Sequence, residues 1–222
     1  MKKIIYIYIL LYSSFCFSQE IFLTEVKATN NNSDKFLYSI KKPDSTSQYL
    51  GKIEVSGFSN NDEAVFSEIY KKAKSIGCNT YIIKSTEKID GSQVFNPSHY
   101  FIDLYYTTPT KIVKEENIIY LINPFKETQV RINDTRLKLN TRSFIKYDIS
   151  KTEITDISVG KFLGSRIKFQ SKEGQPEQYF KISGKKISAN SPNSPGINFK
   201  TGDIIKVEKS YAQFLISIYK IN

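Results

Sequence analysis

The chain has few of the residues from which catalytic and metal sites are usually built. Among its 222 residues there is one histidine, His99, there are two cysteines, and there is no tryptophan. These soft ligands fall short of the four that a structural zinc site takes. A Ser-His-Asp or Cys-His device would have to use His99, and the sequence has neither a Gly-x-Ser-x-Gly elbow nor a glycine-rich phosphate loop. We therefore expect no catalytic residue, no metal site and no cofactor.

The composition also excludes the fibrous and disordered classes of protein. Ten glycines and seven prolines are too few for a collagen-like or low-complexity chain, and 40% apolar residues can bury a core. The formal net charge of +10 is spread along the sequence, because no basic run exceeds two residues and acids interleave. Such a distribution is typical of a solvated surface. We expect no nucleic-acid partner, whereas anionic polysaccharide and lipid headgroups stay open as partners.

The first 18 residues have the layout of an export signal. Two lysines precede an apolar run over residues 4–17, which suits a signal peptide and is short for a membrane span of about 20 residues. Cys16 and Ser18 place small residues at the −3 and −1 positions, so we expect cleavage before Gln19. The layout resembles export signals of the Bacteroidetes type. The sequence thus predicts an exported protein that is periplasmic, associated with the outer membrane, or secreted.

Two alternatives to cleavage remain open. The segment could stay as an N-terminal anchor, or Cys16 could be lipidated, although bulky Phe15 stands where lipoprotein signals have a small residue. After cleavage Cys78 is the one cysteine left, which excludes an internal disulfide. We expect Cys78 to be buried and reduced, as small apolar residues are.

Residues 19–110 are predicted to form a small α/β domain with one main helix on a sheet. Turn-forming residues separate strand-like segments at 21–28, 36–40, 53–58, 80–84 and 100–107. Asn60, Asn61 and Asp62 are residue types that cap helices, and the acids Asp62 and Glu63 suit the positive end of the helix dipole. One apolar stripe follows at helical spacing, made of Val65, Phe66, Ile69, Tyr70, Ala73 and Ile76. Gly77 then marks the end of the helix.

The second half of the chain lacks helical periodicity. Residues 111–117 are predicted to be a linker, because the pattern of the sequence changes there. Short strand-like runs recur beyond it at 118–122, 129–132, 136–139, 144–149, 166–169, 178–182, 203–207 and 214–221. Such a series predicts an all-β domain over residues 118–222, an antiparallel sandwich or barrel. The fold class of the whole chain is therefore predicted to be α+β.

Two family resemblances add to these patterns. Residues 71–84 resemble the helix–glycine–strand element of small bacterial envelope domains of the Rcs stress-sensor and YbjQ-like type. That element has the pattern Ala-x-x-x-Gly-Ala-Asn-x-hydrophobic, and Ala73, Gly77, Cys78 and Asn79 take its defined positions. The likeness covers residues 50–107 and implies an envelope role, such as a stress sensor or inhibitor. In the second half, residues 118–123, 129–139 and 143–148 are similar in rhythm to immunoglobulin-like domains of bacterial envelope proteins. That likeness implies a sandwich fold.

Aromatic residues are the one conspicuous excess, with fifteen tyrosines and fifteen phenylalanines. Several crowd the strand predicted at residues 100–107. Its two faces differ, because Tyr100, Ile102, Leu104 and Tyr106 share one and Phe101, Asp103 and Tyr105 share the other. The aliphatic face should pack on the helix stripe. The face with Asp103 between two aromatics suits an interface, so Phe101, Asp103 and Tyr105 are the candidate interaction residues. We expect Phe101 and Tyr105 to contact either the second domain or an external partner.

These observations favour a binding or interaction module of the bacterial envelope over an enzyme. We expect its partner to be a protein first and a polysaccharide second. One alternative is a hydrolase of envelope polymers that uses a carboxylate pair without a sequence signature. Glu115 and Glu116 are the adjacent acids of the predicted linker, where we expect them to be solvated.

Overall fold

The computed structural model describes residues 19–86, 95–160, 164–183, 186–189, 197–200 and 203–222. The chain divides into two compact units, with the division between Ile112 and Val113. The predicted export signal, residues 1–18, lies outside the described part of the chain. Within that part, no helix is long and apolar enough to cross a membrane.

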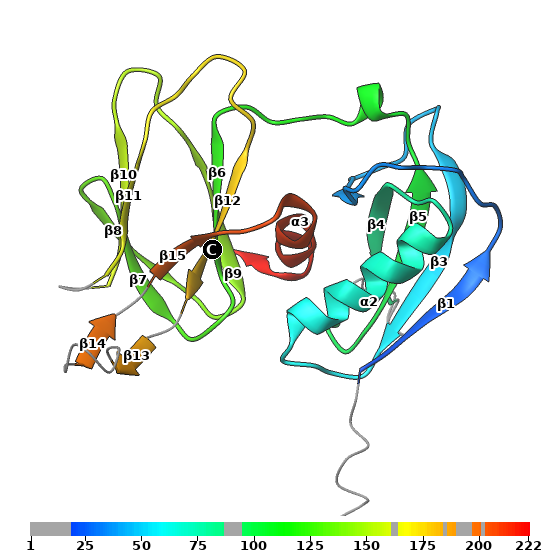
Figure 1. Ribbon diagram of the computed structural model, residues 1–222, viewed down its shortest axis with the longest axis horizontal. Coiled ribbons are helices and arrows are strands. Elements are labelled where there is room, and N and C mark those ends of the chain that lie inside the picture. Colours follow the sequence, from blue (N-terminus) through cyan, green and yellow to red (C-terminus); the bar gives the residue numbers. More distant parts are fainter. Residues whose placement is uncertain (1–18, 87–94, 161–163, 184–185, 190–196, 201–202) are drawn as a thin grey trace, which may run out of the picture. The chain divides into compact units, whose positions relative to one another are not determined.

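The first unit is a five-stranded sheet with a helix against it (Figure 1). Its strands are β1 (Glu20–Val26), β2 (Tyr38–Ser39), β3 (Gln48–Ser56), β4 (Thr80–Ser85) and β5 (His99–Tyr106). They lie in the order β1-β3-β5-β4-β2, and every pairing is antiparallel except that of β2 with β4. The five strand-like segments of the sequence therefore form strands, although β3 begins earlier and β2 is shorter than predicted.

Helix α2 (Asp62–Ser75) confirms the predicted helix, and Asn61 is the one of the three capping residue types that caps it. The Asn61 side chain accepts a hydrogen bond from the backbone N–H of Ala64 at 3.1 Å, which satisfies one of the free donors of the first turn. The stripe residues Val65, Phe66, Ile69 and Ala73 are buried. Spacing and capping were therefore sufficient to place this element.

The end of α2 depends on Gly77. This residue has a φ of +78°, and a Cβ there would lie 1.7 Å from the carbonyl oxygen of Asn30. The backbone N–H of Gly77 donates to Lys74 and that of Cys78 donates to Ala73, both at 3.0 Å. This pair of bonds is the Schellman arrangement, in which a left-handed residue closes the last turn. Glycine is thus required by both conformation and space.

The second unit contains a five-stranded mixed sheet and a four-stranded antiparallel sheet. The first has the order β15-β12-β6-β9-β16 and consists of β15 (Asp203–Lys206), β12 (Gln178–Ser183), β6 (Ile118–Asn123), β9 (Ser143–Asp148) and β16 (Lys220–Ile221). The second has the order β11-β10-β7-β8 and consists of β11 (Arg166–Phe169), β10 (Thr155–Val159), β7 (Thr128–Ile132) and β8 (Thr135–Leu139). A separate pair joins β13 (Lys186–Ala189) to β14 (Ile197–Lys200).

The prediction of a wholly antiparallel second half was wrong. Strand β12 pairs in parallel with β6, and β16 pairs in parallel with β9. Strand β10 was also missed, since no strand was predicted between residues 149 and 166. Apolar residues of both sheets nevertheless form one buried cluster, which includes Ile119, Leu121, Val130, Ile132, Leu139, Ile149, Ile157, Val159, Phe180 and Ile182.

The strand predicted at residues 214–221 is mostly a helix, so the second half is not all-β. Helix α3 (Lys209–Ile218) buries Ala212, Phe214, Leu215 and Ile218. The Glu208 side chain caps it by accepting from the backbone N–H groups of Ser210 at 2.9 Å and Tyr211 at 3.0 Å. A short apolar run fits a strand and a buried helix equally well. Glutamate is also an uncommon cap, so the sequence carried no helix-start signal here.

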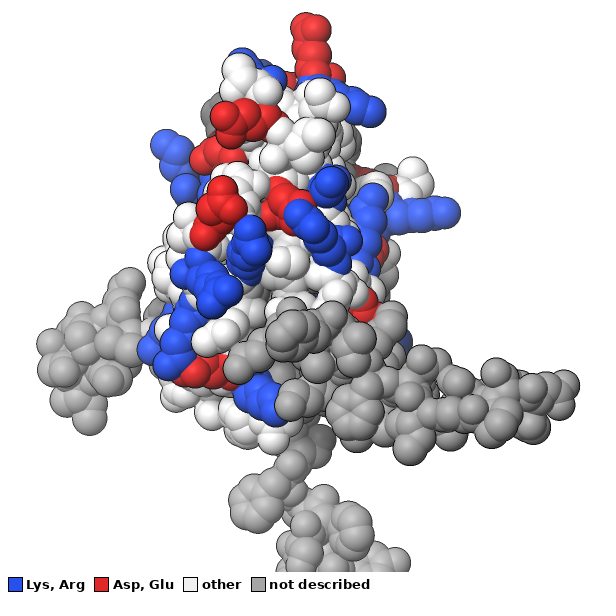
Figure 2. Space-filling view, turned by 90° about the vertical axis from the view of Figure 1, so that its left-hand side faces the viewer, with Lys and Arg blue, Asp and Glu red and all other residues white. Residues whose placement is uncertain are grey.

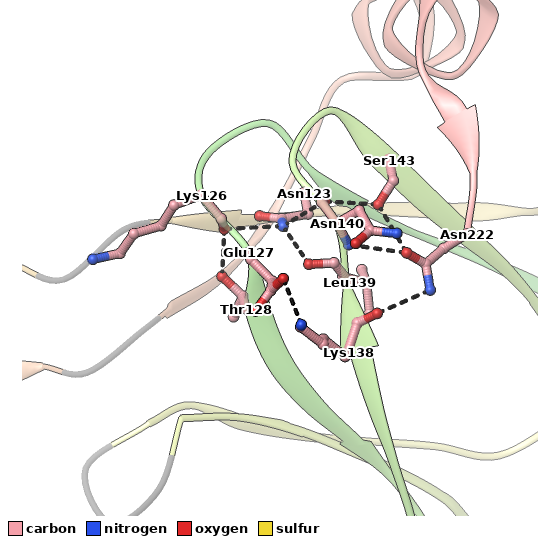
Figure 3. A network of polar contacts seen from close by, with 9 residues as sticks. All are labelled: Asn123, Lys126, Glu127, Thr128, Lys138, Leu139, Asn140, Ser143 and Asn222. Atoms are coloured by element: carbon pink, nitrogen blue, oxygen red, sulfur yellow. Dashed lines mark hydrogen bonds and ion pairs between the residues drawn. The ribbon is translucent and has the colours of Figure 1, made fainter.

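A buried amide joins the strand ends of the second unit (Figure 3). Asn123 is fully buried at the end of β6. The two hydrogens of its Nδ2 are shared among the carbonyl oxygens of Lys126 at 3.1 Å, Leu139 at 3.2 Å and Asn140 at 2.8 Å. The Asn222 side chain accepts from the backbone N–H of Asn140 at 2.9 Å. Hydrogen bonds thus tie β6 to the β7–β8 hairpin and to the residue that follows β16.

Candidate functional site

Strand β5 has the two-faced character that its sequence predicts. Tyr100, Ile102 and Leu104 are buried, with exposed fractions of 2% or less, whereas Phe101, Asp103 and Tyr105 are half-buried on the other face. Figure 1 shows α2 against one face of this sheet. The three candidate residues therefore lie together on one side of β5.

Neighbouring strands extend this side into a larger surface. Phe101 lies opposite Glu54 of β3, which lies opposite Phe22 of β1. Asp103 lies opposite Lys52, and Tyr105 lies opposite Tyr49. We call this surface the aromatic face, and its members are Phe22, Glu25, Tyr49, Lys52, Glu54, His99, Phe101, Asp103 and Tyr105.

Two tyrosines form one end of the aromatic face. The rings of Tyr49 and Tyr105 meet edge to face, with centroids 5.5 Å apart. The Tyr49 hydroxyl donates to Glu25 Oε2 at 2.8 Å. Partial burial raises the pKa of Tyr49, and the bond to Glu25 raises it further. Burial, followed by the nearby charge of Asp103, also raises the pKa of Tyr105. Both phenols therefore stay neutral hydrogen-bonding groups near neutral pH.

Charged groups surround the phenylalanine at the other end. Lys52 Nζ lies 5.8 Å from the ring centroid of Phe101, within the range of a cation–π contact. The ring of His99 lies 5.4 Å from that of Phe101, and its Nε2 lies 2.8 Å from Glu54 Oε1. The only histidine is thus engaged in a surface pair with a carboxylate. This arrangement suits recognition by ring contacts and hydrogen bonds.

Sequence reasoning missed Phe22, Tyr49 and Lys52 as members of this face. Phe22 has an exposed fraction of 51%, and Tyr49 is half-buried. Tyr49 and Lys52 fell outside the predicted strand, since β3 continues through an irregular register between Tyr49 and Gly51. A residue's opposite neighbour depends on strand register, for which an isolated sequence contains no direct signal.

Two glutamates of the second unit, Glu115 and Glu177, contact the neighbouring rings of Tyr120 and Tyr179. Glu115 was expected to be solvated, yet it accepts from the hydroxyl of Tyr120 at 2.5 Å and from Lys146 at 2.6 Å. The Glu177 side chain is only 3% exposed, and its Oε1 lies 2.5 Å from Lys209 Nζ. A lysine thus neutralises each carboxylate.

Two stacked tyrosines connect these carboxylates. The rings of Tyr120 and Tyr179 are 5.1 Å apart and inclined by 12°. Burial is the main cause that raises the pKa of each hydroxyl, and the nearby glutamates add to it. Because ion pairs and rings hold both acids, the arrangement supports a structural role in the second unit. Glu177 Oε2 is buried without a hydrogen-bond partner in the described structure, which is a cost for this cluster.

Metal ligands do not gather in the described part of the chain. No group of three or more His, Cys, Asp or Glu side chains is placed there to hold an ion. Cys78 is buried and forms no disulfide, as predicted, and its Sγ donates to the carbonyl oxygen of Thr80 at 3.1 Å.

Comparison with known proteins leaves both family resemblances as predictions. No protein-family model matches the chain, and neither the curated proteins nor the solved structures give a significant match.

Proposed function

We propose that this chain is an exported, non-enzymatic binding module of the bacterial envelope, and that the aromatic face contacts its partner. The observation that carries the proposal is the arrangement of Phe22, Tyr49, Phe101 and Tyr105 on one side of three neighbouring strands. The sequence pattern of residues 1–18 supports export.

The composition of the aromatic face supports binding to a macromolecule. Aromatic residues are enriched in interfaces and supply most hot spots, because a ring buries a large area with few rotatable bonds. Lys52, Glu54 and Asp103 lie among the rings and would set orientation through charge. A dry core would disfavour these ions.

The ring geometry favours a protein partner over a polysaccharide. A flat sugar ring stacks best on a flat aromatic platform, whereas Tyr49 and Tyr105 meet edge to face with an interplanar angle of 67°. Mixed rings and ions of both signs resemble the core and rim of a protein interface. A polysaccharide remains the second choice of partner for this face.

The second unit is proposed to be a β-sandwich that supports this module. Buried residues of both sheets belong to one cluster, as Ile119 and Leu121 of β6 and Val130 and Ile132 of β7 illustrate. Facing sheets with a shared apolar layer are the hallmark of that architecture. Methyl–methyl contacts measured by NMR between these residues would test the arrangement.

A site-specific crosslinking experiment tests the proposed interface. A photoreactive phenylalanine analogue replaces Tyr105 in one sample and Phe58, an exposed ring outside the aromatic face, in the other. We expect a discrete crosslinked protein from envelope extract at position 105 and not at position 58. Unmodified protein should compete for that product.

A matched pair of double variants then measures how much the aromatic face contributes to the free energy of binding. Phe101→Ser with Tyr105→Ser should weaken binding of the identified partner by about 2–4 kcal/mol, the usual hot-spot range. The control, Phe36→Ser with Phe58→Ser, also removes two exposed rings of the first unit and should retain affinity. Equal losses in both variants, or unfolding of the first unit by the Phe101 and Tyr105 pair, would show that the face is not an interface.

A further inference from the structure

Arginines from three strands, β7, β8 and β11, form a row on the four-stranded sheet of the second unit. Arg136 of β8 lies opposite Arg131 of β7, which lies opposite Ser158 of β10. Ser158 in turn lies opposite Arg166 of β11. We call these four residues the arginine row. Strands are about 4.8 Å apart, so the row spans roughly 14 Å.

The arginine row belongs to the outward side of its sheet. The residues between its members, such as Val130, Ile132 and Ile157, are part of the buried cluster. The Arg131 side chain is 53% exposed and that of Arg166 is 64% exposed. Figure 2 looks onto this part of the molecule and shows basic side chains gathered across its middle, with acidic ones among and above them.

Additional polar groups flank the row. Lys138 lies opposite Gln129 on one side, and Lys168 lies opposite Asp156 on the other. A hollow of about 270 Å³ opens beside it and is lined by Arg131, Asp156, Ser158, Val159, Gly160, Gly164 and Arg166. That volume is just below the usual range of small-molecule pockets, so it suits one sugar unit or one anionic group.

The ion pairs on this side of the four-stranded sheet do not neutralise all of its positive charge. Asp156 binds Arg166 through two nitrogens, since the single N–H of Nε is shared between both carboxylate oxygens at 2.6 and 2.7 Å and Nη2 lies 2.5 Å from Oδ2. Arg131 Nη2 lies 3.0 Å from Asp134 Oδ1. Within the described residues, no ion pair engages Arg136 or Lys168. The side chains of Arg131 and Asp134 are both more than half exposed, so their pair contributes little energy and Arg131 can exchange it for an external anion.

Two arginines also face one another directly. Arg131 and Arg136 are opposite residues of the β7–β8 hairpin, and like charges in that relation destabilise a sheet. An anion bound between them would remove the repulsion. Hairpin stability alone therefore gives no reason for this pair.

The residues around the arginine row fit an acidic polysaccharide better than an anionic membrane or a nucleic acid. Large exposed apolar side chains, which membrane insertion needs, lie outside β7, β8, β10 and β11 among the described residues. Outward positions of these strands carry no aromatic ring on which a nucleic-acid base could stack. Ser158 lies opposite Arg131, and Gln129 lies two residues from Arg131 on the same face, so both offer polar groups that suit sugar hydroxyls.

We propose that the arginine row binds a linear acidic polysaccharide with carboxylate or sulfate groups along its chain. Guanidinium groups pair with such anions through two parallel hydrogen bonds. The straight row follows one polymer chain across the four strands. The row belongs to the second unit and the aromatic face to the first, so separate variants test the two surfaces.

Binding assays with defined polymers test this proposal. Heparin and polygalacturonate supply sulfate and carboxylate groups, and dextran is the neutral control. We expect both acidic polymers to bind, and their affinity to fall steeply between about 50 and about 300 mM NaCl because salt screens the charges. Vesicles with anionic lipid and single-stranded oligothymidine represent the two other classes and should bind more weakly.

Two triple variants distinguish the effect of the arginine row on binding from the effect of net charge. Arg131→Gln, Arg136→Gln and Arg166→Gln together should lower the affinity roughly tenfold or more, since each loses a charge-assisted contact. The control, Lys41→Gln, Lys42→Gln and Lys111→Gln, removes the same charge from exposed sites of the first unit and should lower it less than about twofold. Far-UV circular dichroism checks that both variants are folded.

Hydrogen exchange provides a readout that needs no variant. Added polymer should slow amide exchange in β7, β10 and β11 of the unmodified protein. Equal losses in the two triple variants, tighter binding of vesicles or oligothymidine, or no protection of these strands would overturn the proposal. Failure of the protein-partner crosslink would leave these outcomes unaffected, so the two functions fail separately.

Discussion

Cys78 shows how burial determines the chemistry of a single residue. It directly follows the glycine that ends α2, and its exposed fraction is zero. Burial raises the pKa of its thiol from 9.0 to about 12. Since the thiolate is the reactive species, a thiol with this pKa is inert near neutral pH.

We predict that a thiol reagent at pH 8 labels Cys78 in unfolded protein and leaves the native protein unlabelled. Stability should also fall as pH rises from about 9 towards about 12, because the unfolded thiol loses its proton before the folded one does. Cys78→Ala should reduce this slope by at most about 1.4 kcal/mol per pH unit. Denaturant titrations at pH 8 and pH 10.5 measure it, and rapid labelling of the native state would refute the expectation.

Asn123 is a buried polar residue of the second unit whose side chain supports the fold through hydrogen bonds. Its amide shares two hydrogens among three carbonyl oxygens (Figure 3), and unpaired buried carbonyls carry a desolvation cost. We predict that Asn123→Ala lowers the free energy of unfolding by about 1–3 kcal/mol. Asn123→Asp should cost more, because a carboxylate would face the same oxygens. The control is Asn140→Ala, since the network uses the backbone of that exposed residue; urea denaturation should leave it near wild type.

At the scale of elements, the two helices differ in how clearly their sequences predict a helix. Helix α2 has a capping asparagine, two acids in its first turn and a six-residue apolar stripe before the glycine that ends it. Local sequence signals and the burial of the stripe therefore both favour a helix. In α3 the cap is Glu208, and the apolar residues are too few to separate helix from strand. Packing of Phe214 and Leu215, both fully buried, therefore decides the outcome.

The α3 cap is testable by removal of its carboxylate. Glu208→Ala leaves the N–H groups of Ser210 and Tyr211 without their acceptor, and we expect a loss of about 0.5–2 kcal/mol. Urea denaturation measures the change. Glu153→Ala removes an exposed acid outside any helix and should have little effect. Equal stability of the two variants would show that the cap contributes nothing.

At the scale of the whole molecule, the predicted linker is shorter than its sequence indicates. Glu115 and Asn117 bond within the second unit, since the Glu115 carbonyl accepts from the N–H of Glu177 at 3.0 Å and the Asn117 N–H donates to Gln175 at 2.8 Å. Val113, by contrast, is 89% exposed. Only a few residues around the division at Ile112 and Val113 therefore resemble a linker.

Limited proteolysis tests this division. Lys111 and Lys114 flank the exposed residue, and both are exposed themselves. We predict that trypsin cleaves after these lysines and that both units then remain folded, because each has its own core. Mass spectrometry identifies the cut, and Lys111→Gln with Lys114→Gln should abolish it. Cooperative loss of both units after cleavage would show that neither folds alone.

The amino-acid sequence by itself determined the features that depend on near neighbours in the chain. The cap, stripe and stop of α2, the alternation of β5 and the burial of Cys78 all follow from local periodicity and hydrophobicity. Phe101, Asp103 and Tyr105 shared a face for the same reason.

Only the tertiary structure decided which distant residues meet. Tyr49 joins Tyr105, and Arg131, Arg136 and Arg166 form one row, because strand pairing brings them into register. In the sequence those arginines looked like scattered surface charge. Register is set by the sum of many side-chain contacts across a sheet, and a shift of one residue would turn the row into the core. The candidate sites therefore depend on long-range packing, which short-range patterns do not encode.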